Sequence, residues 1–246
     1  MGTSYNPRIV TDGLILCLDA ANKRSYPGSG STWNDLSKQG NNGTLINGPT
    51  FSNEGNGSIL CDGMNDYINV SNFNEDSNQD LSVIVWVYPV TLGNLTTGGF
   101  DYSWLINKRD NSDDKQWQMF FRSIEGDNDF FLRLSIYDDT AGTQTGLGLS
   151  STTEIFINQW YQCGFTFNSS NSEGNLYING VYESSDTLGG TGNRKTGSRD
   201  LVISKTAWDN TDYLNANISS VQIYNKVLSE QEIRQNYNSI KARFGL

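Results

Sequence analysis

The chain of 246 residues contains no histidine. Histidine is the side chain that titrates closest to neutral pH, and it is the usual general base and a common zinc ligand. Its absence excludes Ser-His-Asp and Cys-His catalytic arrangements, which need an imidazole to activate the nucleophile. Zinc sites that depend on histidine are excluded for the same reason.

Cysteine is scarce, and Cys17, Cys61 and Cys163 each stand inside an apolar run. Their wide spacing matches neither a metal-binding nor a redox motif. We expect three reduced, buried thiols that behave as small hydrophobic side chains.

Charged residues make up only 18% of the sequence, and the acidic ones dominate, which gives a formal net charge of −10. Such a chain lacks the basic surface that nucleic acid and anionic membranes require, so we expect neither as a partner. No apolar run is long enough to insert into a membrane, and the N-terminus lacks a signal-peptide pattern.

The chain does contain 25 glycines and a series of short strand-like runs with turns between them. These runs cover residues 13–19, 57–62, 66–70, 81–90, 103–108, 117–122, 130–137, 157–168, 174–185 and 201–205. The run at 81–90 is apolar on both faces, which is typical of a central strand. No helical pattern separates these runs, so the sequence predicts an all-β antiparallel sandwich.

Two local patterns support antiparallel pairing. Residues 130–137 alternate between an apolar face (Phe130, Leu132, Leu134 and Ile136) and a mixed face (Phe131, Arg133, Ser135 and Tyr137). The pair Asn179-Gly180 is typical of a type I′ turn, which joins the strands of a hairpin. A second hairpin is predicted around residues 125–128.

The end of the chain has a different pattern. Val221 and Ile223 alternate with polar residues, which predicts a half-buried strand. Ser229 and Glu232 then form a capping-box pattern, with Leu228 and Ile233 placed as a hydrophobic staple. The spacing predicts one short C-terminal α-helix over 229–243, with Gly245 as its stop. We expect residues 1–246 to form one domain.

Several segments resemble a known family, in the order that the family shows. They are GLILCLDAAN (13–22), DLSKQGNNGTLINGPTF (35–51), LCDGMNDYINV (60–70), NQWYQCGFTF (158–167), LYINGV (176–181) and the closing segment 217–237. Together they resemble the laminin-G-like, concanavalin-A-like lectin/glucanase jelly rolls. The resemblance implies two curved antiparallel sheets with the closing helix near the N-terminal strand, and it implies no particular activity.

Two segments resemble copies of this domain in tailed-phage structural proteins. They are the opening DAAN..SYPGSG..W.DLS (19–37) and the ending QNYNSIKARFGL (235–246). The resemblance implies a virion protein that assembles in the host cytoplasm.

The acidic turn Asp62–Asp66 is similar to the strand–turn–strand signature of the family. Oxygen ligands on a tight turn suit Ca²⁺, so Asp62, Asn65 and Asp66, with Asp35 in addition, are candidate calcium ligands. The alternative is a turn that its own Asp and Asn side chains stabilise. The final strand reads Ile218-Ser219-Ser220, where metal-bearing relatives often have an acidic residue, which argues against calcium.

The carboxylates Glu125, Asp127 and Asp129 superficially resemble the catalytic pair of the glucanases. Retaining hydrolysis needs two carboxyl groups at a fixed short separation. These residues fall in a turn, where strand alternation is broken, so we interpret them as an exposed hairpin tip. We interpret Asp110, Asp113 and Asp114 as an acidic loop, and we expect no catalytic residues.

A sugar site needs an exposed aromatic ring beside hydrogen-bonding groups. The loop with Trp208, Asp209, Asp212 and Tyr213 has that chemistry, and the strand face with Gln118, Arg122, Arg133 and Tyr137 is a second candidate patch. The alternatives are a loop-anchoring Trp208 and a solvated strand face. We interpret Trp33, Trp86 and Trp160 as structural.

The sequence therefore favours a non-enzymatic phage virion protein, either a capsid decoration or a fibre or tail component. Its expected partners are other virion proteins, further copies of itself and a cell-surface glycan. The alternatives are a glycoside hydrolase or polysaccharide lyase on the same scaffold, and a bacterial surface adhesin.

Overall fold

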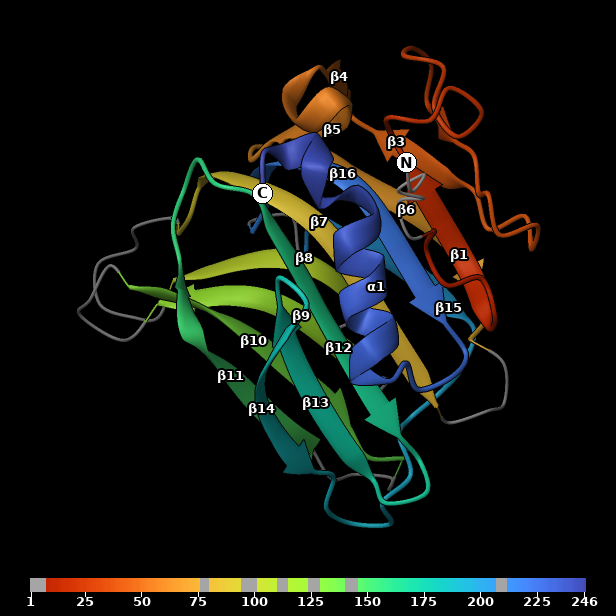
Figure 1. Cartoon of the computed structure of the whole chain (residues 1–246), viewed down its shortest axis with the longest axis vertical. Coiled ribbons are helices and arrows are strands. Elements are labelled where there is room, and N and C mark those ends of the chain that lie inside the picture. The colour runs from red at the N-terminus through yellow and green to blue at the C-terminus, as the bar shows by residue number, and fades with distance from the viewer. Residues whose placement is uncertain are drawn as a thin grey trace, which may run out of the picture.

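The computed structural model describes residues 8–75, 80–93, 101–109, 115–123, 129–139, 146–206 and 212–246. Within them the chain forms two antiparallel sheets, packed face to face, and one α-helix outside (Figure 1). The predicted all-β sandwich with a C-terminal helix is confirmed.

Sheet A contains eight strands in the order β14-β13-β12-β7-β16-β5-β4, with β1 also paired to β16. These strands are β1 (Leu14–Asp19), β4 (Thr50–Ser52), β5 (Ser58–Asp62), β7 (Leu81–Thr91), β12 (Tyr161–Asn168), β13 (Glu173–Ile178), β14 (Val181–Thr187) and β16 (Asn215–Tyr224). β5 and β1 pair with successive halves of β16, so they lie end to end along one of its sides.

Sheet B also contains eight strands, in the order β11-β10-β9-β8-β15-β6-β3-β2. These strands are β2 (Thr32–Trp33), β3 (Gly43–Ile46), β6 (Tyr67–Phe73), β8 (Tyr102–Arg109), β9 (Lys115–Ser123), β10 (Phe130–Tyr137), β11 (Gly146–Ile155) and β15 (Arg199–Ile203). One hydrophobic cluster from both sheets fills the space between them. The three cysteines are free and buried, as predicted, and burial raises the pKa of the Cys61 thiol to about 12.

Strand β7 is the centre of sheet A, between β12 and β16. Its inner side chains Val83 and Val85 belong to the core between the sheets. Its outer side chains Ile84 and Trp86 are buried as well, because the C-terminal helix covers them. This explains why residues 81–90 are apolar on both faces.

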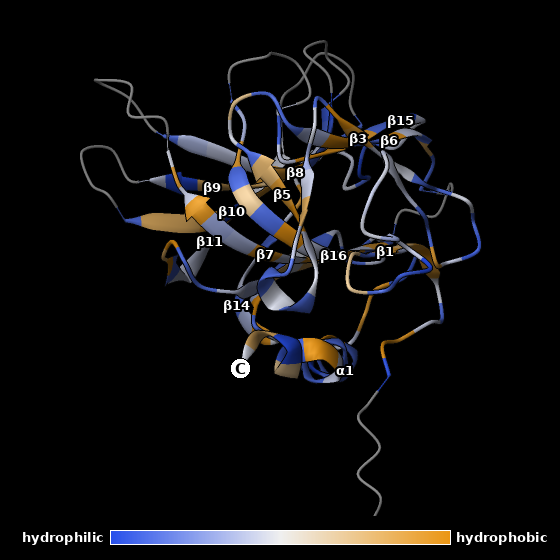
Figure 2. Ribbon diagram, turned by 90° about the horizontal axis from the view of Figure 1, so that it is seen from above, coloured by the Kyte–Doolittle hydropathy of each residue, from blue (hydrophilic) through white to orange (hydrophobic). Residues whose placement is uncertain are grey.

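The helix α1 (Glu230–Ile240) lies across the outer face of sheet A, and a 3₁₀ turn (Lys241–Phe244) continues it (Figures 1 and 2). Its N-terminus carries the predicted capping box between Ser229 and Glu232. The rings of Tyr237 and Phe244 stack on Trp86, with centroids 5.6 and 4.2 Å away. The predicted helix over 229–243 is confirmed, except that its last turn is 3₁₀.

No helix in the described part of the chain has both the length and the apolar character needed to cross a lipid bilayer.

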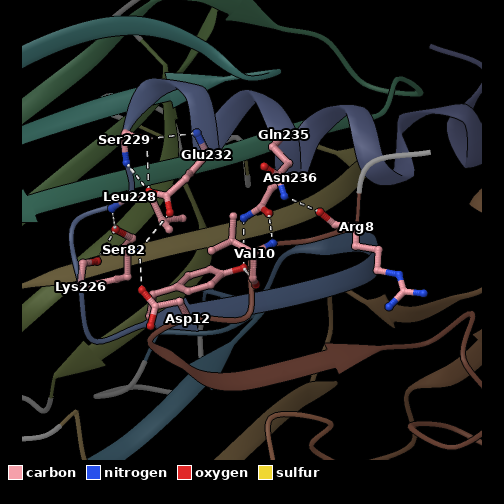
Figure 3. A network of polar contacts seen from close by, with 11 residues as sticks. Arg8, Val10, Asp12, Ser82, Lys226, Leu228, Ser229, Glu232, Gln235 and Asn236 are labelled. Atoms are coloured by element: carbon pink, nitrogen blue, oxygen red, sulfur yellow. Dashed lines mark hydrogen bonds and ion pairs between the residues drawn. The ribbon is translucent and has the colours of Figure 1, made fainter. Parts of the chain in front are cut away.

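The N-terminal segment is attached to this helix by buried hydrogen bonds (Figure 3). The Oδ1 atom of Asn236 accepts a hydrogen bond from the Val10 N–H at 2.7 Å, and its Nδ2 donates to the Tyr224 hydroxyl at 3.0 Å. That hydroxyl in turn lies 3.0 Å from the carbonyl oxygen of Val10. The three groups tie the chain start, β16 and α1 together.

Some predictions about strands were wrong. The half-buried strand predicted from Val221 and Ile223 implies that Gln222 and Tyr224 between and beside them are exposed, but α1 and the N-terminal segment bury that face of β16. The run predicted at 157–168 forms a strand only from Tyr161. Before it the chain turns, because Asn158 has a positive φ and its N–H donates a hydrogen bond to the carbonyl oxygen of Pro89. Strand β11, at the edge of sheet B, was missed because Gly, Ser and Thr dilute its apolar alternation.

Other local predictions are confirmed. Asn179 and Gly180 have φ values of 53° and 76°, as a type I′ turn requires. Phe130, Leu132, Leu134 and Ile136 are buried and the residues between them are not. β9 and β10 pair as a hairpin, but its tip at 124–128 lies outside the described residues. Trp33, Trp86 and Trp160 are all buried.

A fully buried cluster of charges fixes the end of β8. Glu75 accepts hydrogen bonds from Arg194 and from the Trp117 indole, and it lies 3.5 Å from the Lys108 ammonium. Burial opposes ionisation of Glu75, but the two cations outweigh it and lower the pKa of the carboxyl group. Lys108 also donates to the Gly197 carbonyl at 2.6 Å, so this cluster anchors the chain beside Arg109.

The edge strands of the two sheets are joined by Glu183 of β14. Its carboxylate accepts the N–H groups of Thr152 and Thr153 of β11, both at 2.9 Å, and both hydroxyls at 2.7 Å. Burial alone would raise the pKa of Glu183, but these hydrogen bonds from threonine outweigh it and lower the pKa. One carboxylate therefore links the edge strand β14 of sheet A to the edge strand β11 of sheet B.

We expect Asn236→Ala to lower the free energy of unfolding by about 1–3 kcal/mol, because the buried Val10 N–H loses its acceptor. Urea denaturation followed by tryptophan fluorescence measures this. Asn238→Ala is the matched control, since Asn238 lies on the same helix and is only half-buried. Equal losses in the two variants would contradict the role given to Asn236.

We expect Glu183→Gln to lower the melting temperature at neutral pH. A carboxyl group with a lowered pKa in the folded state stabilises the protein above the ordinary glutamate pKa of about 4.3, and this stabilisation disappears as pH falls through the folded-state pKa. Calorimetry should therefore show the difference from wild type shrinking below about pH 4. Asp186→Asn, on the same strand but exposed, is the control. A difference that persists in acid would refute this account.

Candidate functional site

The outer face of sheet B carries the side chains that alternate with its core residues. In β9, Trp117, Met119 and Phe121 belong to the core, so Gln118, Phe120 and Arg122 lie on the outer face. The register with β10 sets Arg122 opposite Phe131, Phe120 opposite Arg133 and Gln118 opposite Ser135. Cross-strand partners share a face of the sheet, so both arginines lie on this outer face.

Three aromatic rings from β8 and β9 form the floor of this surface. Trp104 lies 5.7 Å from Tyr102 and 4.7 Å from Phe120, measured between ring centroids. Trp104 and Phe120 are only 4% and 6% exposed, whereas Tyr102 is half-buried and reaches the surface. The guanidinium of Arg122 lies over the Tyr102 ring, 5.3 Å from its centroid.

A cavity of about 420 Å³ lies over this aromatic floor. Its lining residues are Tyr102, Trp104, Arg109, Gln118, Phe120, Arg122, Ser135 and Asp212. Within it, a guanidinium nitrogen of Arg109 donates to Gln118 Oε1 at 2.6 Å. The cavity therefore combines an apolar floor with guanidinium, amide and carboxylate groups.

A second cavity of about 440 Å³ adjoins the first on the side of β15 and β6. Its lining residues are Tyr67, Asn69, Asn72, Arg109, Ser198, Arg199, Asp200, Val202, Lys205 and Thr206. Arg109 lines both cavities, so we treat the two together as the sheet B groove. The ammonium of Lys205 lies over the Tyr67 ring, 4.6 Å from its centroid.

The groove brings together two patches that the sequence suggested separately. Arg122, from the strand face, and Asp212, from the 208–213 loop, line the same cavity. Tyr137 lies beside it, because its hydroxyl accepts a hydrogen bond from Gln118 at 3.2 Å, and burial raises its pKa. Arg133 is the cross-strand neighbour of Phe120 in the floor.

The remaining predicted sugar-binding residues have other positions. Tyr213 is only 9% exposed, so its ring is not available to pack against a sugar. The centroid of this ring lies 5.6 Å from the Lys205 ammonium, which it contacts instead. Trp208 and Asp209 lie outside the described residues.

Sequence reasoning missed Tyr102, Trp104 and Arg109 of β8, and Tyr67 and Lys205 of the second cavity. The alternation of Tyr102 and Trp104 was a usable signal for a shared outer face. Register shifts in the pairing of β8 with β9 interrupt that alternation before Arg109. For this reason the position of Arg109 could not be read from period-2 spacing.

The four candidate calcium ligands do not gather in one place. Asp62 Oδ1 accepts the N–H groups of Met64 and Asn65, and Asp66 Oδ2 accepts the N–H of Asp62. Burial and the nearby charge of Asp62 raise the pKa of Asp66. The turn interpretation therefore describes this acidic segment.

Asp35 is used elsewhere, since its carboxylate accepts the N–H groups of Cys17, Ser37 and Asn41. Among the described residues, no three acidic or cysteine side chains are grouped so as to hold a metal ion. The structure therefore gives no support to a calcium site shared by Asp35, Asp62 and Asp66 in the part of the chain that it covers.

The other acidic segments can be placed only in part. Glu125, Asp127, Asp110, Asp113 and Asp114 lie outside the described residues. Asp129 is described and half-buried, directly before β10.

Comparison with solved structures finds similar folds at low sequence identity. The binding domain of Paraclostridial Mosquitocidal Protein 1 matches with a TM-score of 0.68 and 18% identity, over 93% of this chain and 52% of that one. The botulinum neurotoxin type G receptor binding domain matches with a TM-score of 0.65 and 18% identity, over 92% and 51%. This chain thus spans about half the length of each of these two structures.

A third structure is similar over nearly its whole length. Domain 4 of AbnA, an extracellular arabinanase from Geobacillus stearothermophilus solved in complex with arabinotriose, matches with a TM-score of 0.63 and 15% identity, over 91% of this chain and 98% of that one. At such identities these matches show the fold alone.

No curated protein matches the chain. The model of a family described as the concanavalin A-like lectin/glucanases superfamily (Laminin_G_3) matches residues 62–234, which include β6 to β16, most of both sheets and the first turn of α1. The chain belongs to this superfamily.

Proposed function

We propose that the chain is a non-catalytic carbohydrate-binding module and that it binds a glycan in the sheet B groove. The observation that carries this proposal is the aromatic floor of Tyr102, Trp104 and Phe120 beneath Arg109 and Gln118 in one cavity. A pyranose ring has an apolar face that packs on an aromatic ring, and its hydroxyls need hydrogen-bonding groups alongside. The groove offers both kinds of contact.

The similar structures support this proposal at the level of the fold. Domain 4 of AbnA was solved with arabinotriose, and two others are described as binding domains of toxins. The same scaffold hosts many activities, so the residues of the groove carry the argument here.

The number of carboxylates in the groove favours binding over hydrolysis. Among the described residues, Asp212 alone supplies a carboxylate to the first cavity and Asp200 alone to the second. Asp200 is engaged with the Asn69 amide at 3.0 Å and the Asn72 N–H at 2.8 Å. Glycoside hydrolysis uses two carboxyl groups on either side of the scissile bond, so a glycoside hydrolase or lyase is the less favoured alternative.

We further propose that this module is carried on a phage particle, as a capsid decoration or as part of a fibre or tail. Its partners would be other virion proteins and further copies of itself. The support is the resemblance of residues 19–37 and 235–246 to tailed-phage structural proteins. A bacterial surface adhesin is the alternative carrier of the same module.

The glycan proposal predicts signals on a glycan array that Tyr102→Ala removes, because Tyr102 is the ring of the floor that reaches the surface. Trp208→Ala tests the sequence-based prediction for Trp208, which lies outside the described residues. Tyr182→Ala is the control, since Tyr182 is an aromatic residue 45% exposed on β14, away from the groove. A wild-type array without signal, or equal loss in the control, would reject the groove as a glycan site.

The particle proposal predicts that mass spectrometry of purified phage particles detects this chain in constant stoichiometry with the major capsid or tail proteins. Lysate from cells that express the chain alone, carried through the same purification, controls for co-sedimentation. Absence of the chain from the particles would reject a virion role and would leave the glycan proposal standing.

A further inference from the structure

Arg122 lines the first cavity of the groove, and Arg133 lies beside it on the neighbouring strand. Arg122 opposes Phe131 and Arg133 opposes Phe120, so Arg122 and Arg133 are diagonal neighbours on the outer face of sheet B. Diagonal cross-strand neighbours are about 7–8 Å apart, within reach of long side chains. The Tyr102 ring lies beneath the guanidinium of Arg122, and Tyr102 also interacts electrostatically with Arg133.

The surroundings of Arg133 oppose its positive charge. Arg133 is half-buried, and burial together with the charge of Arg122 lowers its pKa. Its Nε atom is buried and, within the part of the chain that the structure describes, has no hydrogen-bond partner. A guanidinium placed in this way gains most from an anion that accepts hydrogen bonds from it and offsets the repulsion from Arg122.

Basic side chains outnumber acidic ones in the described lining of the groove, although the protein as a whole is acidic. Its described lining residues include Arg109, Arg122, Arg199 and Lys205, against Asp200 and Asp212. The chain as a whole carries a formal net charge of −10.

The groove's shape and chemistry select one class of anion. The part of Tyr102 that reaches the surface offers an apolar contact for a sugar, and a guanidinium binds a planar carboxylate through two parallel hydrogen bonds. A long polyanion such as nucleic acid would meet the negative charge of the rest of the chain. A short saccharide with a carboxylate on its ring meets only the groove.

We propose that the ligand is an acidic saccharide, with its carboxylate bound by Arg133 and Arg122 and its sugar ring in contact with the exposed part of Tyr102. This inference rests on the proposed function and specifies the chemical class of the glycan. Uronic acids and sialic acids both present such a carboxylate, and the experiment separates them.

The test is calorimetric titration of the full chain with three acidic oligosaccharides: tetragalacturonate, a hyaluronan tetrasaccharide and 3′-sialyllactose. Each is paired with its neutral methyl ester. We expect at least one acid to bind, its ester to bind at least about tenfold more weakly, and affinity to fall with added salt, because a charge-assisted pair of hydrogen bonds is lost or screened. Which acid binds identifies the source of the carboxylate.

Variants connect the effect to the arginines. Arg133→Gln should weaken the affinity for the acid by about tenfold and leave the affinity for the ester unchanged. Arg133→Lys should retain only part of the wild-type affinity for the acid. Arg234→Gln removes the same charge from the exposed face of α1 and should change neither.

The outcomes separate this inference from the proposed function. If an acid and its ester bind equally, or if Arg133→Gln has no effect on the acid, the acidic inference is overturned while glycan binding stands. If neutral sugars on the array bind and none of the three acids does, the acidic inference is again overturned while glycan binding stands. If no saccharide of any class binds, the proposed function itself fails.

Discussion

The C-terminal helix packs on the central strands of sheet A, on the side of the sandwich opposite the sheet B groove. Trp86 of β7 is enclosed between the core and the rings of Tyr237 and Phe244. The capping box at Ser229 and the Asn236 contacts with Val10 and Tyr224 fix the helix in that position. The helix therefore covers the outer face of the central strands of sheet A, whereas no helix in the described part of the chain lies on the outer face of sheet B, where the groove is.

The sheet B groove uses that surface through strand register rather than through a special loop. Alternation along β9 and β10 sends aromatic core residues inward and Arg122, Arg133 and Phe120 outward. The buried cluster of Glu75, Lys108 and Arg194 holds the end of β8, next to Arg109, which both cavities share. The same core that stabilises the sandwich thus positions the side chains of the site.

The sequence was informative where local pattern decides structure. The Asn179-Gly180 turn and the capping box at Ser229 depend on neighbours within a few residues, and both are confirmed. The strand at 81–90 is also confirmed, because its own apolar residues on both faces mark it as central. The burial of Tyr224 could not be predicted in this way, because a helix formed later in the chain covers it.

The site was predictable in its parts and not in its assembly. Arg122 and Asp212 were both candidates, but only long-range strand pairing places them in one cavity. Tyr102 and Trp104 alternate along β8, but only the pairing of β8 with β9 places Trp104 beside Phe120, and the register shifts that follow Trp104 hide the position of Arg109. Asp35 and Asp62 look like partners in a sequence of acidic turns, yet each carboxylate is engaged by backbone N–H groups of its own surroundings.

The link made by Glu183 has a consequence for how copies of this chain behave when crowded. An unpaired edge strand is a template on which another molecule can add a strand, and this is a common route to aggregation. Here the N–H groups of Thr152 and Thr153 on β11 are occupied by a carboxylate from the neighbouring sheet, which also places a charge at the rim. Many copies could then be arrayed at high local density while each remains a separate folded unit.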